Sequence, residues 1–215
     1  MTTLICVSDT HMYKPKLPPG DIFCFAGDFS SRGQSHETFS FCNWMHTISK
    51  DFKNLIIIPG NHDHFVENNV NLFKSRLPRN AVCLIDEGVT REGISFWGSP
   101  FTPRFFNWAF MEDRGDPIKR HWDLIPENID VLITHGPVYG ILDQNPAGKC
   151  CGCKELRDQV FNRIKPKYHL FGHIHLQGSR KIKIKDTEFF NLSYVDEDYQ
   201  PTNSVTVIDI DKFLN

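Results

Sequence analysis

Five short apolar runs, each ending in polar residues, constrain the fold of this chain more than any other feature. The runs with their tails are Thr3–Val7 before SDTH, Ile22–Ala26 before GDFS, Leu55–Ile58 before PGNHDH, Val131–Ile133 before THGP and Tyr168–Phe171 before GHIH. They are rich in β-branched and aromatic residues and have the length of strands. Continuous apolar runs are typical of strands buried on both faces, as in partly parallel sheets.

Helical patterns lie between these runs. Apolar residues recur about once per turn from 39 to 48 and from 156 to 164, where Pro166 predicts a helix end. Three prolines in 14–20 exclude a helix there. Hairpin turns are predicted at Glu92-Gly93 and Asp186-Thr187, and a final strand over 204–210. We therefore predict an α/β fold, a four-layer sandwich of two mixed β-sheets flanked by helices. Without repeats or a linker, residues 1–215 are predicted to form a single domain.

Composition narrows the class of protein. The formal net charge of −2 argues against a surface that coats nucleic acid. No apolar stretch reaches membrane-spanning length, so we expect no membrane insertion. The start, MTTLICVSDTH, lacks the basic and hydrophobic regions of a secretion signal, and a cytoplasmic location is expected.

The seven cysteines fall into two groups. Four lie in apolar runs and are predicted to be buried, reduced thiols: Cys6, Cys24, Cys42 and Cys83. Cys150, Cys151 and Cys153 are bunched in KCCGCKEL, but a zinc site there would need a fourth ligand at a recognisable spacing. A loop entering a helix is favoured, and redox sensitivity is the lesser alternative. The N–H groups of Gly152 and Cys153 would then cap that helix or, less favoured, bind phosphate.

The polar tails carry metal-binding residue types. In an extended chain residues i and i+2 share a face, so His173 and His175 are predicted to point into one space, as are Asp9 and His11. Ile174 would point the other way, into the core. Loops at the carboxyl ends of strands converge in open α/β sheets. The tails are therefore expected to form one site.

Together the tails offer seven oxygen and nitrogen donors: Asp9, His11, Asp28, Asn61, His135, His173 and His175. This set, without thiolates, suits Mn²⁺, Fe²⁺ or Zn²⁺. Seven donors are too many for one tetrahedral ion and natural for two ions that share a carboxylate. The glycines before Asp28, Asn61 and His173 are predicted to let the backbone turn sharply.

The order D-x-H, G-D, G-N-H-D, H, G-H-x-H resembles that of the calcineurin-like metallophosphoesterase superfamily. Closer still is the resemblance to the metallophosphoesterase-domain-containing proteins, a branch related to class III cyclic nucleotide phosphodiesterases. It rests on LPPGDIFCFAGDFS, WGSPFTPRFFNWAF, WDLIPENIDVLITHGP, GCKEL and FGHIHLQG.

The resemblance implies how the donors are divided. Asp9, His11, Asp28 and His175 would hold the first metal. Asp28, as the bridge, with Asn61, His135 and His173 would hold the second. Two divalent ions are implied, with Mn²⁺ preferred and Fe²⁺, Zn²⁺, Ni²⁺ or Co²⁺ as alternatives.

The same resemblance implies a phosphodiesterase acting on small cyclic nucleotides (2′,3′ or 3′,5′) or related diesters. In that mechanism, two ions ~3.5–4 Å apart would lower the pKa of a bridging water, and the resulting hydroxide would attack the phosphorus in line. His62 would act as the general acid for the leaving group. Asp63 is predicted either to accept a hydrogen bond from the His62 ring or to cap the helix beginning near Phe65.

Some residues keep two interpretations. The aromatic stretch 96–110 either packs over the sheets, the favoured account, or gives rings such as Phe105 and Phe106 on which a nucleobase stacks. His64 is expected to be a solvated neighbour of the site. Histidines outside the motifs are expected at the surface or in the core: His36, His46, His121 and His169.

Three rival functions stay open. A phosphomonoesterase or a nuclease would use the same donors, although the chain is short for a separate DNA-binding domain. A scaffold would keep the metal site only as structure. The expected partner is a small phosphodiester or nucleotide; nucleic acid is not favoured, and a homodimer is left open.

Overall fold

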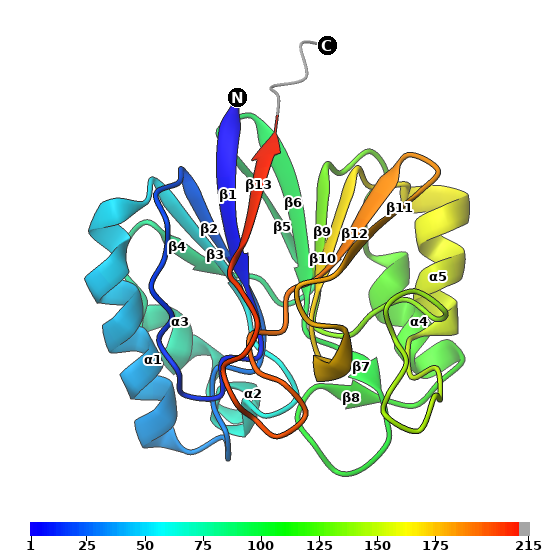
Figure 1. Cartoon of the computed structure of the whole chain (residues 1–215), viewed down its shortest axis with the longest axis horizontal. Coiled ribbons are helices and arrows are strands. Elements are labelled where there is room, and N and C mark those ends of the chain that lie inside the picture. The colour runs from blue at the N-terminus through cyan, green and yellow to red at the C-terminus, as the bar shows by residue number, and fades with distance from the viewer. Residues whose placement is uncertain (211–215) are drawn as a thin grey trace.

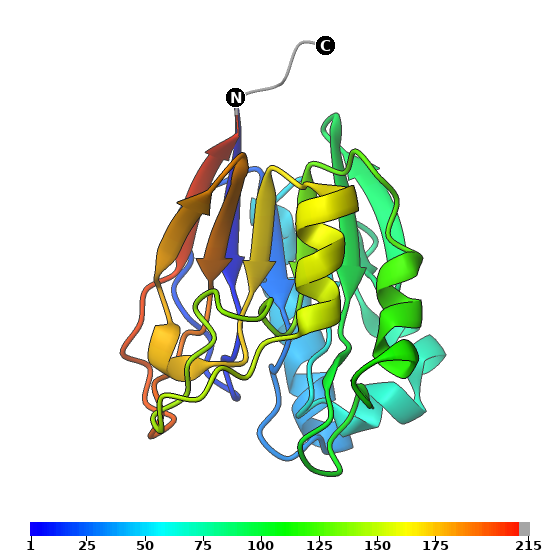
Figure 2. The ribbon, with the colours of Figure 1, turned by 90° about the vertical axis from the view of Figure 1, so that its right-hand side faces the viewer.

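The computed structural model describes residues 1–210, which form two large mixed β-sheets with helices on both outer sides, and a separate pair of two-residue strands (Figure 1). One sheet has the strand order β13-β1-β2-β3-β4 and the other β11-β12-β10-β9-β6-β5. The helices α1 and α3 cover the first sheet, whereas α4 and α5 cover the second (Figures 1 and 2). The predicted fold class, a sandwich of two mixed sheets between helices, is confirmed.

The strands are β1 (Thr2–Val7), β2 (Ile22–Ala26), β3 (Asn54–Ile58), β4 (Ala81–Cys83), β5 (Glu87–Arg91), β6 (Ile94–Ser99), β7 (Thr102–Pro103), β8 (Met111–Glu112), β9 (Val131–Thr134), β10 (Tyr168–Phe171), β11 (Lys181–Ile184), β12 (Thr187–Asn191) and β13 (Thr206–Ile210). The α-helices are α1 (Ser35–Ile48), α2 (His64–Asn68), α3 (Val70–Arg76), α4 (Asp116–Asp123) and α5 (Lys154–Gln159). A π-helical turn, Val160–Ile164, continues α5, and 3₁₀ turns span Ser49–Asp51 and His175–Gln177. All five apolar runs are strands, as predicted.

The apolar runs are continuous because each inner strand lies between two hydrophobic layers. In β2, Phe23 and Phe25 pack toward the helices, whereas Cys24 and Ala26 pack between the two sheets. The second sheet repeats this pattern, with Leu132 turned toward α4 and α5. Four layers thus enclose three apolar interfaces, and neither face of an inner strand needs polar residues.

Parallel pairing brings the carboxyl ends of the strands together. Strands β1 to β4 are parallel neighbours, as are β6, β9, β10 and β12; the antiparallel strands β13, β5 and β11 lie at the edges. The loops after the parallel strands meet at the lower edge in Figure 1, near β7, β8 and α2, away from the N-terminus. The polar tails are therefore gathered at one edge.

The hairpins agree with the sequence at one turn and differ at the other. Glu92 and Gly93 form the first turn with positive φ, as predicted. The second turn is Lys185–Asp186, one residue earlier than predicted. Thr187 instead pairs with Ile184, and its buried hydroxyl donates to the Pro166 carbonyl oxygen at 2.6 Å. A β-branched side chain with a buried partner favours the strand over the turn.

The remaining expectations concern cysteines, histidines and membrane insertion. All seven thiols are free, and the four in apolar runs are buried, as predicted. Cys153 precedes α5, where its sulfur accepts from the Leu156 N–H, so KCCGCKEL is a loop entering a helix. His121 and His169 are buried, whereas His36 and His46 are exposed. Within residues 1–210 no helix is long and apolar enough to span a bilayer.

Replacing Phe73 by alanine should lower the free energy of unfolding by about 3–5 kcal/mol. Phe73 in α3 is fully buried, and its ring stacks on Phe29 and Phe41 at centroid distances of 5.6 and 6.3 Å. Its loss leaves a cavity behind the loop that carries Asp28. Urea denaturation measures the change.

The matched control is Leu72→Ala in the same helix, where the side chain is 38% exposed. We expect this control to lose less than about 1 kcal/mol. Equal losses from the two variants would contradict the packing described here.

Candidate metal centre

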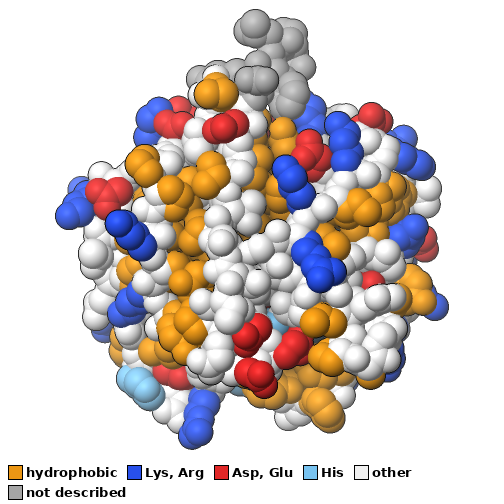
Figure 3. Space-filling view, viewed as in Figure 1, with side chains coloured by type: hydrophobic (Ala, Val, Ile, Leu, Met, Phe, Trp, Pro, Cys, Tyr) orange, Lys and Arg blue, Asp and Glu red, His pale blue; other side chains and the backbone are white. Residues whose placement is uncertain are grey.

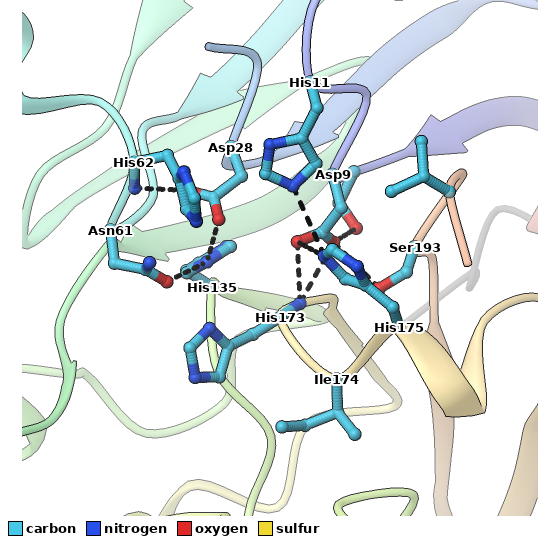
Figure 4. Close-up of polar contacts among 12 residues, drawn as sticks. Asp9, His11, Asp28, Asn61, His62, His135, His173, Ile174, His175 and Ser193 are labelled. Atoms are coloured by element: carbon cyan, nitrogen blue, oxygen red, sulfur yellow. Dashed lines mark hydrogen bonds and ion pairs between the residues drawn. The ribbon is translucent and has the colours of Figure 1, made fainter. Parts of the chain in front are cut away.

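The structure brings all seven predicted donors together at the lower edge of the sheets (Figure 4). Each follows a strand of the parallel core: β1 for Asp9 and His11, β2 for Asp28, β3 for Asn61, β9 for His135, and β10 for His173 and His175. Five of them are buried, and His173 and His175 are partly exposed. One side of the cluster thus stays open to solvent.

The donors form overlapping groups whose ligand atoms lie within 4.8 Å of one another. One group contains Asp9, His11 and His175, and another contains Asp28, His135 and His173. A third group, of His11, Asp28 and His62, connects them. His173 and His175 therefore belong to different groups.

The spacing of the donor atoms is that of coordination shells. His11 Nε2 lies 3.3 Å from His175 Nε2, and His135 Nε2 lies 2.9 Å from Asn61 Oδ1 and 3.2 Å from Asp28 Oδ2. Divalent ions bind such atoms at about 2.0–2.2 Å, which places neighbouring ligands about 3 Å apart. The residues present therefore fit the divalent metal ions that the donor set suggests.

Backbone carbonyls fix the orientation of three imidazoles. The Nδ1 atoms of His11, His135 and His175 lie 3.1, 2.9 and 3.1 Å from the carbonyl oxygens of Ser30, Ala26 and Asp196. A carbonyl oxygen only accepts, so each Nδ1 carries the proton. Each Nε2 is left free to bind a metal, which is the usual arrangement around metal-binding histidines.

The backbone around these histidines is not the extended chain that the i, i+2 argument assumed. Strand β10 ends at Phe171, His173 has φ +69°, and His175 begins a 3₁₀ turn. Asp9 and His11 likewise have φ of +48° and +39°. The His173 N–H donates to the Asp9 carboxylate at 3.0 Å, which holds the turn in place. Left-handed non-glycine residues cost free energy and cluster at functional sites.

The glycines beside the site mainly provide space. Only Gly27, before Asp28, has the positive φ (+98°) of a sharp turn. A Cβ on Gly60 would lie 2.3 Å from Asp28 Oδ1, and one on Gly172 would lie 1.9 Å from Asp9 Oδ2. The prediction of sharp turns is correct for Gly27, whereas Gly60 and Gly172 let ligand side chains pass close to the backbone.

The titratable groups are biased toward forms that bind cations. Although burial opposes it, the positive charges of His135 and His62 hold the pKa of Asp28 well below its usual range. Burial lowers the pKa of His11 to about 4 and that of His173 to about 3. Ionised carboxylates and neutral imidazoles are the forms that metals require.

His135 and His175 are the exceptions among these groups. Burial alone would lower both pKa values, but the hydrogen bond to Asp9 and its charge raise the pKa of His175. The charge of Asp28 and the hydrogen bond to it raise the pKa of His135 to about 9. The proton shared by His135 Nε2 and Asp28 Oδ2 therefore occupies the position that a bound metal ion would take. Metal binding at this position releases that proton.

His62 lies beside His11 and Asp28, and Asp63 makes neither of the two contacts predicted for it. His62 Nδ1 donates to the Ser31 carbonyl oxygen at 2.8 Å, so Asp63 is not its hydrogen-bond partner. Asp63 precedes α2, yet its side chain forms no capping hydrogen bond. Its buried carboxylate accepts from the backbone N–H groups of Asp28, Ser30 and Gly60 and from the Ser30 hydroxyl. Asp63 therefore ties together the loops after β2 and β3.

Sequence reasoning missed two serines that hold Asp9. The hydroxyls of Ser8 and Ser193 donate to Asp9 Oδ2 at 2.5 and 2.9 Å. Figure 4 shows Ser193 beside Asp9, whose Oδ1 accepts the His173 N–H and lies 3.5 Å from His175 Nε2. Ser193 follows β12 in the stretch FFNLS, where an apolar run again ends in polar residues. That shared pattern was the available signal.

The aromatic stretch divides between the two accounts. Phe96 and Phe110 are buried in the core, whereas Phe105 and Phe106 are exposed. The Phe105 ring lies 5.6 Å from the His173 ring, and Trp108 lies 4.4 Å from His62. Part of the stretch therefore lines the site.

On the two-ion arrangement that the resemblance implies, Gly172→Ala should remove one of two Mn²⁺ ions, because the added Cβ would displace the Asp9 carboxylate. Isothermal titration with Mn²⁺ measures the stoichiometry, which we expect to fall from two ions per chain to one. Gly136→Ala is the matched control. Its Cβ would lie 3.0 Å from the Thr102 methyl group, and the nearest atom of a proposed ligand residue would be the His173 ring carbon Cδ2, at 4.0 Å. Two ions of unchanged affinity in Gly172→Ala would refute this account of the glycine.

Asp63→Asn should lower the free energy of unfolding by about 2–4 kcal/mol, because an amide nitrogen cannot accept the hydrogen bonds made to one carboxylate oxygen. Denaturant unfolding of the metal-free protein gives the value. Asp51→Asn, at an exposed position, should change it by less than about 0.5 kcal/mol. Unaltered stability in Asp63→Asn would show that these bonds do not hold the loops.

Comparison with known proteins agrees with this geometry. The family model described as calcineurin-like phosphoesterase matches residues 3–177. Metallophosphoesterase domain-containing protein 1 of Homo sapiens is 36% identical over 234 residues, covering 97% of this chain and 71% of its own length. A UPF0046 protein of Caenorhabditis elegans is 32% identical over 237 residues, covering 96% of this chain and 59% of its own length.

Among solved structures, the Sulfate thiohydrolase SoxB of Termus thermophilus aligns with a TM-score of 0.43 and 14% identity. The alignment covers 80% of this chain and 33% of the SoxB chain. The matched family model covers the motifs that supply all seven donors. The chain belongs to the calcineurin-like phosphoesterase family.

Proposed function

We propose that this protein is a phosphodiesterase with two divalent metal ions, acting on small phosphodiesters such as 2′,3′- or 3′,5′-cyclic nucleotides. The observation that carries the proposal is the position of Asp28, which belongs both to the group with His135 and His173 and to the group with His11 and His62. A carboxylate between two sets of donors is the arrangement that a pair of bridged ions needs.

The proposed ligands extend two of these groups, adding Asp28 to the group of Asp9, His11 and His175, and Asn61 to the group of Asp28, His135 and His173. Asp9, His11, Asp28 and His175 hold the first ion, and Asp28, Asn61, His135 and His173 hold the second. When bound, the two ions supply a nucleophile from water at neutral pH and neutralise charge on the phosphoryl oxygens. We propose Mn²⁺ as the native ion, with Fe²⁺, Zn²⁺, Ni²⁺ and Co²⁺ as the alternatives to test.

His62 is the proposed general acid. Because its Nδ1 donates to the Ser31 carbonyl oxygen, Nε2 is the atom available to the substrate. The Trp108 ring, tilted against the imidazole at a centroid distance of 4.4 Å, restrains its orientation. In the protonated form Nε2 gives its proton to the departing ester oxygen.

The diester reaction is favoured over the nuclease alternative. The face shown in Figure 3 intersperses Lys and Arg with Asp and Glu and carries no broad basic patch, and the net charge is −2. Polynucleotide binding draws most of its affinity from clustered basic residues. A small substrate needs no such surface. We propose that the protein is soluble and cytoplasmic and that it has no nucleic-acid partner.

Two variants separate the ligand and acid roles. Asn61→Ala should lose the second ion and at least 100-fold in kcat on bis(4-nitrophenyl) phosphate. His62→Ala should keep two Mn²⁺ ions per chain but lose roughly 100-fold or more in kcat on a diester with a poor, alkoxide leaving group. The loss should be smaller with 4-nitrophenolate, which leaves without a proton. Loss of an ion in His62→Ala would make His62 a ligand instead.

The same assay distinguishes the rival functions. Preference for 4-nitrophenyl phosphate over the diester would indicate a phosphomonoesterase. No turnover of either compound with any of the five metals would favour the scaffold. Full activity in Asn61→Ala would overturn the two-metal assignment.

A further inference from the structure

The loop between β12 and β13 carries a tyrosine that no motif of the site includes. The Tyr199 ring lies 4.8 Å from His11, 5.3 Å from His175 and 6.3 Å from His62, measured between centroids, and each pair is edge-on. Three imidazoles of the site thus surround one side of this ring. The residue is nevertheless 45% exposed, so the rest of its surface faces the open side of the site.

The loop is fastened to the site through one carbonyl group. The Asp196 carbonyl oxygen accepts from His175 Nδ1 at 3.1 Å and from the Tyr199 N–H at 3.0 Å. The Asp196 carboxylate in turn accepts from the N–H groups of Asp198 and Gln200 and from the Thr202 hydroxyl. The position of Tyr199 is therefore set by the same group that orients a proposed metal ligand.

The conformation of Tyr199 is one that a bulky residue rarely adopts. Its φ is +58°, in the left-handed region. For an aromatic side chain this backbone is unfavourable, and such strain persists where the surroundings enforce it. Within residues 1–210 its hydroxyl forms no hydrogen bond with another residue, so the ring is not held there by a polar partner.

The charges near Tyr199 indicate which kind of substrate group its ring can contact. The neighbours of Tyr199 in the loop, Glu197 and Asp198, are exposed and acidic. Figure 3 shows acidic side chains gathered low on this face of the molecule. These carboxylates disfavour direct binding of phosphate by the loop, whereas the ring offers an apolar surface to an uncharged group. The ring is also closer to His11 and His175 than to His62, beside which the leaving group would lie.

We propose that Tyr199 is a specificity-determining residue whose ring packs against the ester group that stays on phosphorus, so that among diesters with the same leaving group it favours a flat, apolar group over a small one. The inference rests on the proposed phosphodiesterase function, since a monoester has no such group. It places a specificity determinant outside the metal-binding motifs.

The test compares two diesters with the same leaving group, methyl 4-nitrophenyl phosphate and phenyl 4-nitrophenyl phosphate. In Mn²⁺-loaded wild type we expect a KM about tenfold lower for the phenyl compound, the size of an aromatic contact. Tyr199→Gly removes the ring while suiting the positive φ, and it should bring the two KM values within twofold. Tyr199→Phe should restore the preference.

Controls separate loss of the ring from damage to the site. Tyr199→Gly should still bind two Mn²⁺ ions per chain, and its inhibition constant for inorganic phosphate should match that of wild type. Tyr13→Ala removes another exposed tyrosine, whose ring contacts none of the site imidazoles in the described chain, and should keep the preference for phenyl.

The outcomes are distinguishable. Three results would overturn the role of Tyr199 while leaving the phosphodiesterase intact. The phenyl preference could persist in Tyr199→Gly, or wild type could lack it. The inhibition constant for phosphate in Tyr199→Gly could also rise as much as the KM for the phenyl diester. Failure of wild type to hydrolyse either diester with any of the five metals would overturn the proposed function, and the inference with it.

Discussion

The buried carboxylate of Asp28 is the group around which the site is arranged. It accepts the His62 N–H at 2.7 Å through Oδ1 and faces His135 Nε2 at 3.2 Å through Oδ2. Its backbone N–H is bound by Asp63, and the missing side chain of Gly60 leaves it room. A buried anion is costly unless it is paired. The surrounding imidazoles, and metal ions when present, supply that pairing.

The donor set also leaves the site attractive to an anion. Two divalent ions would carry four positive charges, and Asp9 and Asp28 cancel two of them. The other donors are neutral imidazoles and the Asn61 amide, so positive charge remains for a phosphodiester. Backbone strain at Asp9, His11, Asp28 and His173 shows what this geometry costs, since all four have positive φ. The apolar layers of the sandwich hold those turns in place.

The sequence predicts much of this arrangement because its apolar runs indicate which strands are buried and the order of polar residues indicates where each strand ends. Apolar runs ending in polar residues predicted the strands, and parallel strands bring their carboxyl ends to one edge. That reasoning placed all seven donors at one edge. It was weaker on local backbone: His173 and His175 were predicted to lie on one extended strand, whereas His173 itself is left-handed and His175 begins a 3₁₀ turn.

What the sequence did not predict depends on contacts between distant segments. Asp63 was expected to accept a hydrogen bond from His62 or to cap α2. It instead binds the backbone of the loop after β2, 33 to 35 residues away in the sequence. Ser193 reaches Asp9 across 184 residues, and Tyr199 reaches His11 from the other end of the chain. No local spacing encodes such pairs. Only the packing of the two sheets brings them together.

The central claim is that Asp28 bridges two metal ions, and electron paramagnetic resonance of the Mn²⁺-loaded protein tests it most directly. Bridged ions about 3.5–4 Å apart are magnetically coupled. At two equivalents of Mn²⁺ we predict the multiline spectrum of a coupled pair in wild type and its loss in Asp28→Asn. The six-line spectrum of isolated Mn²⁺ from wild type at this loading would contradict the account.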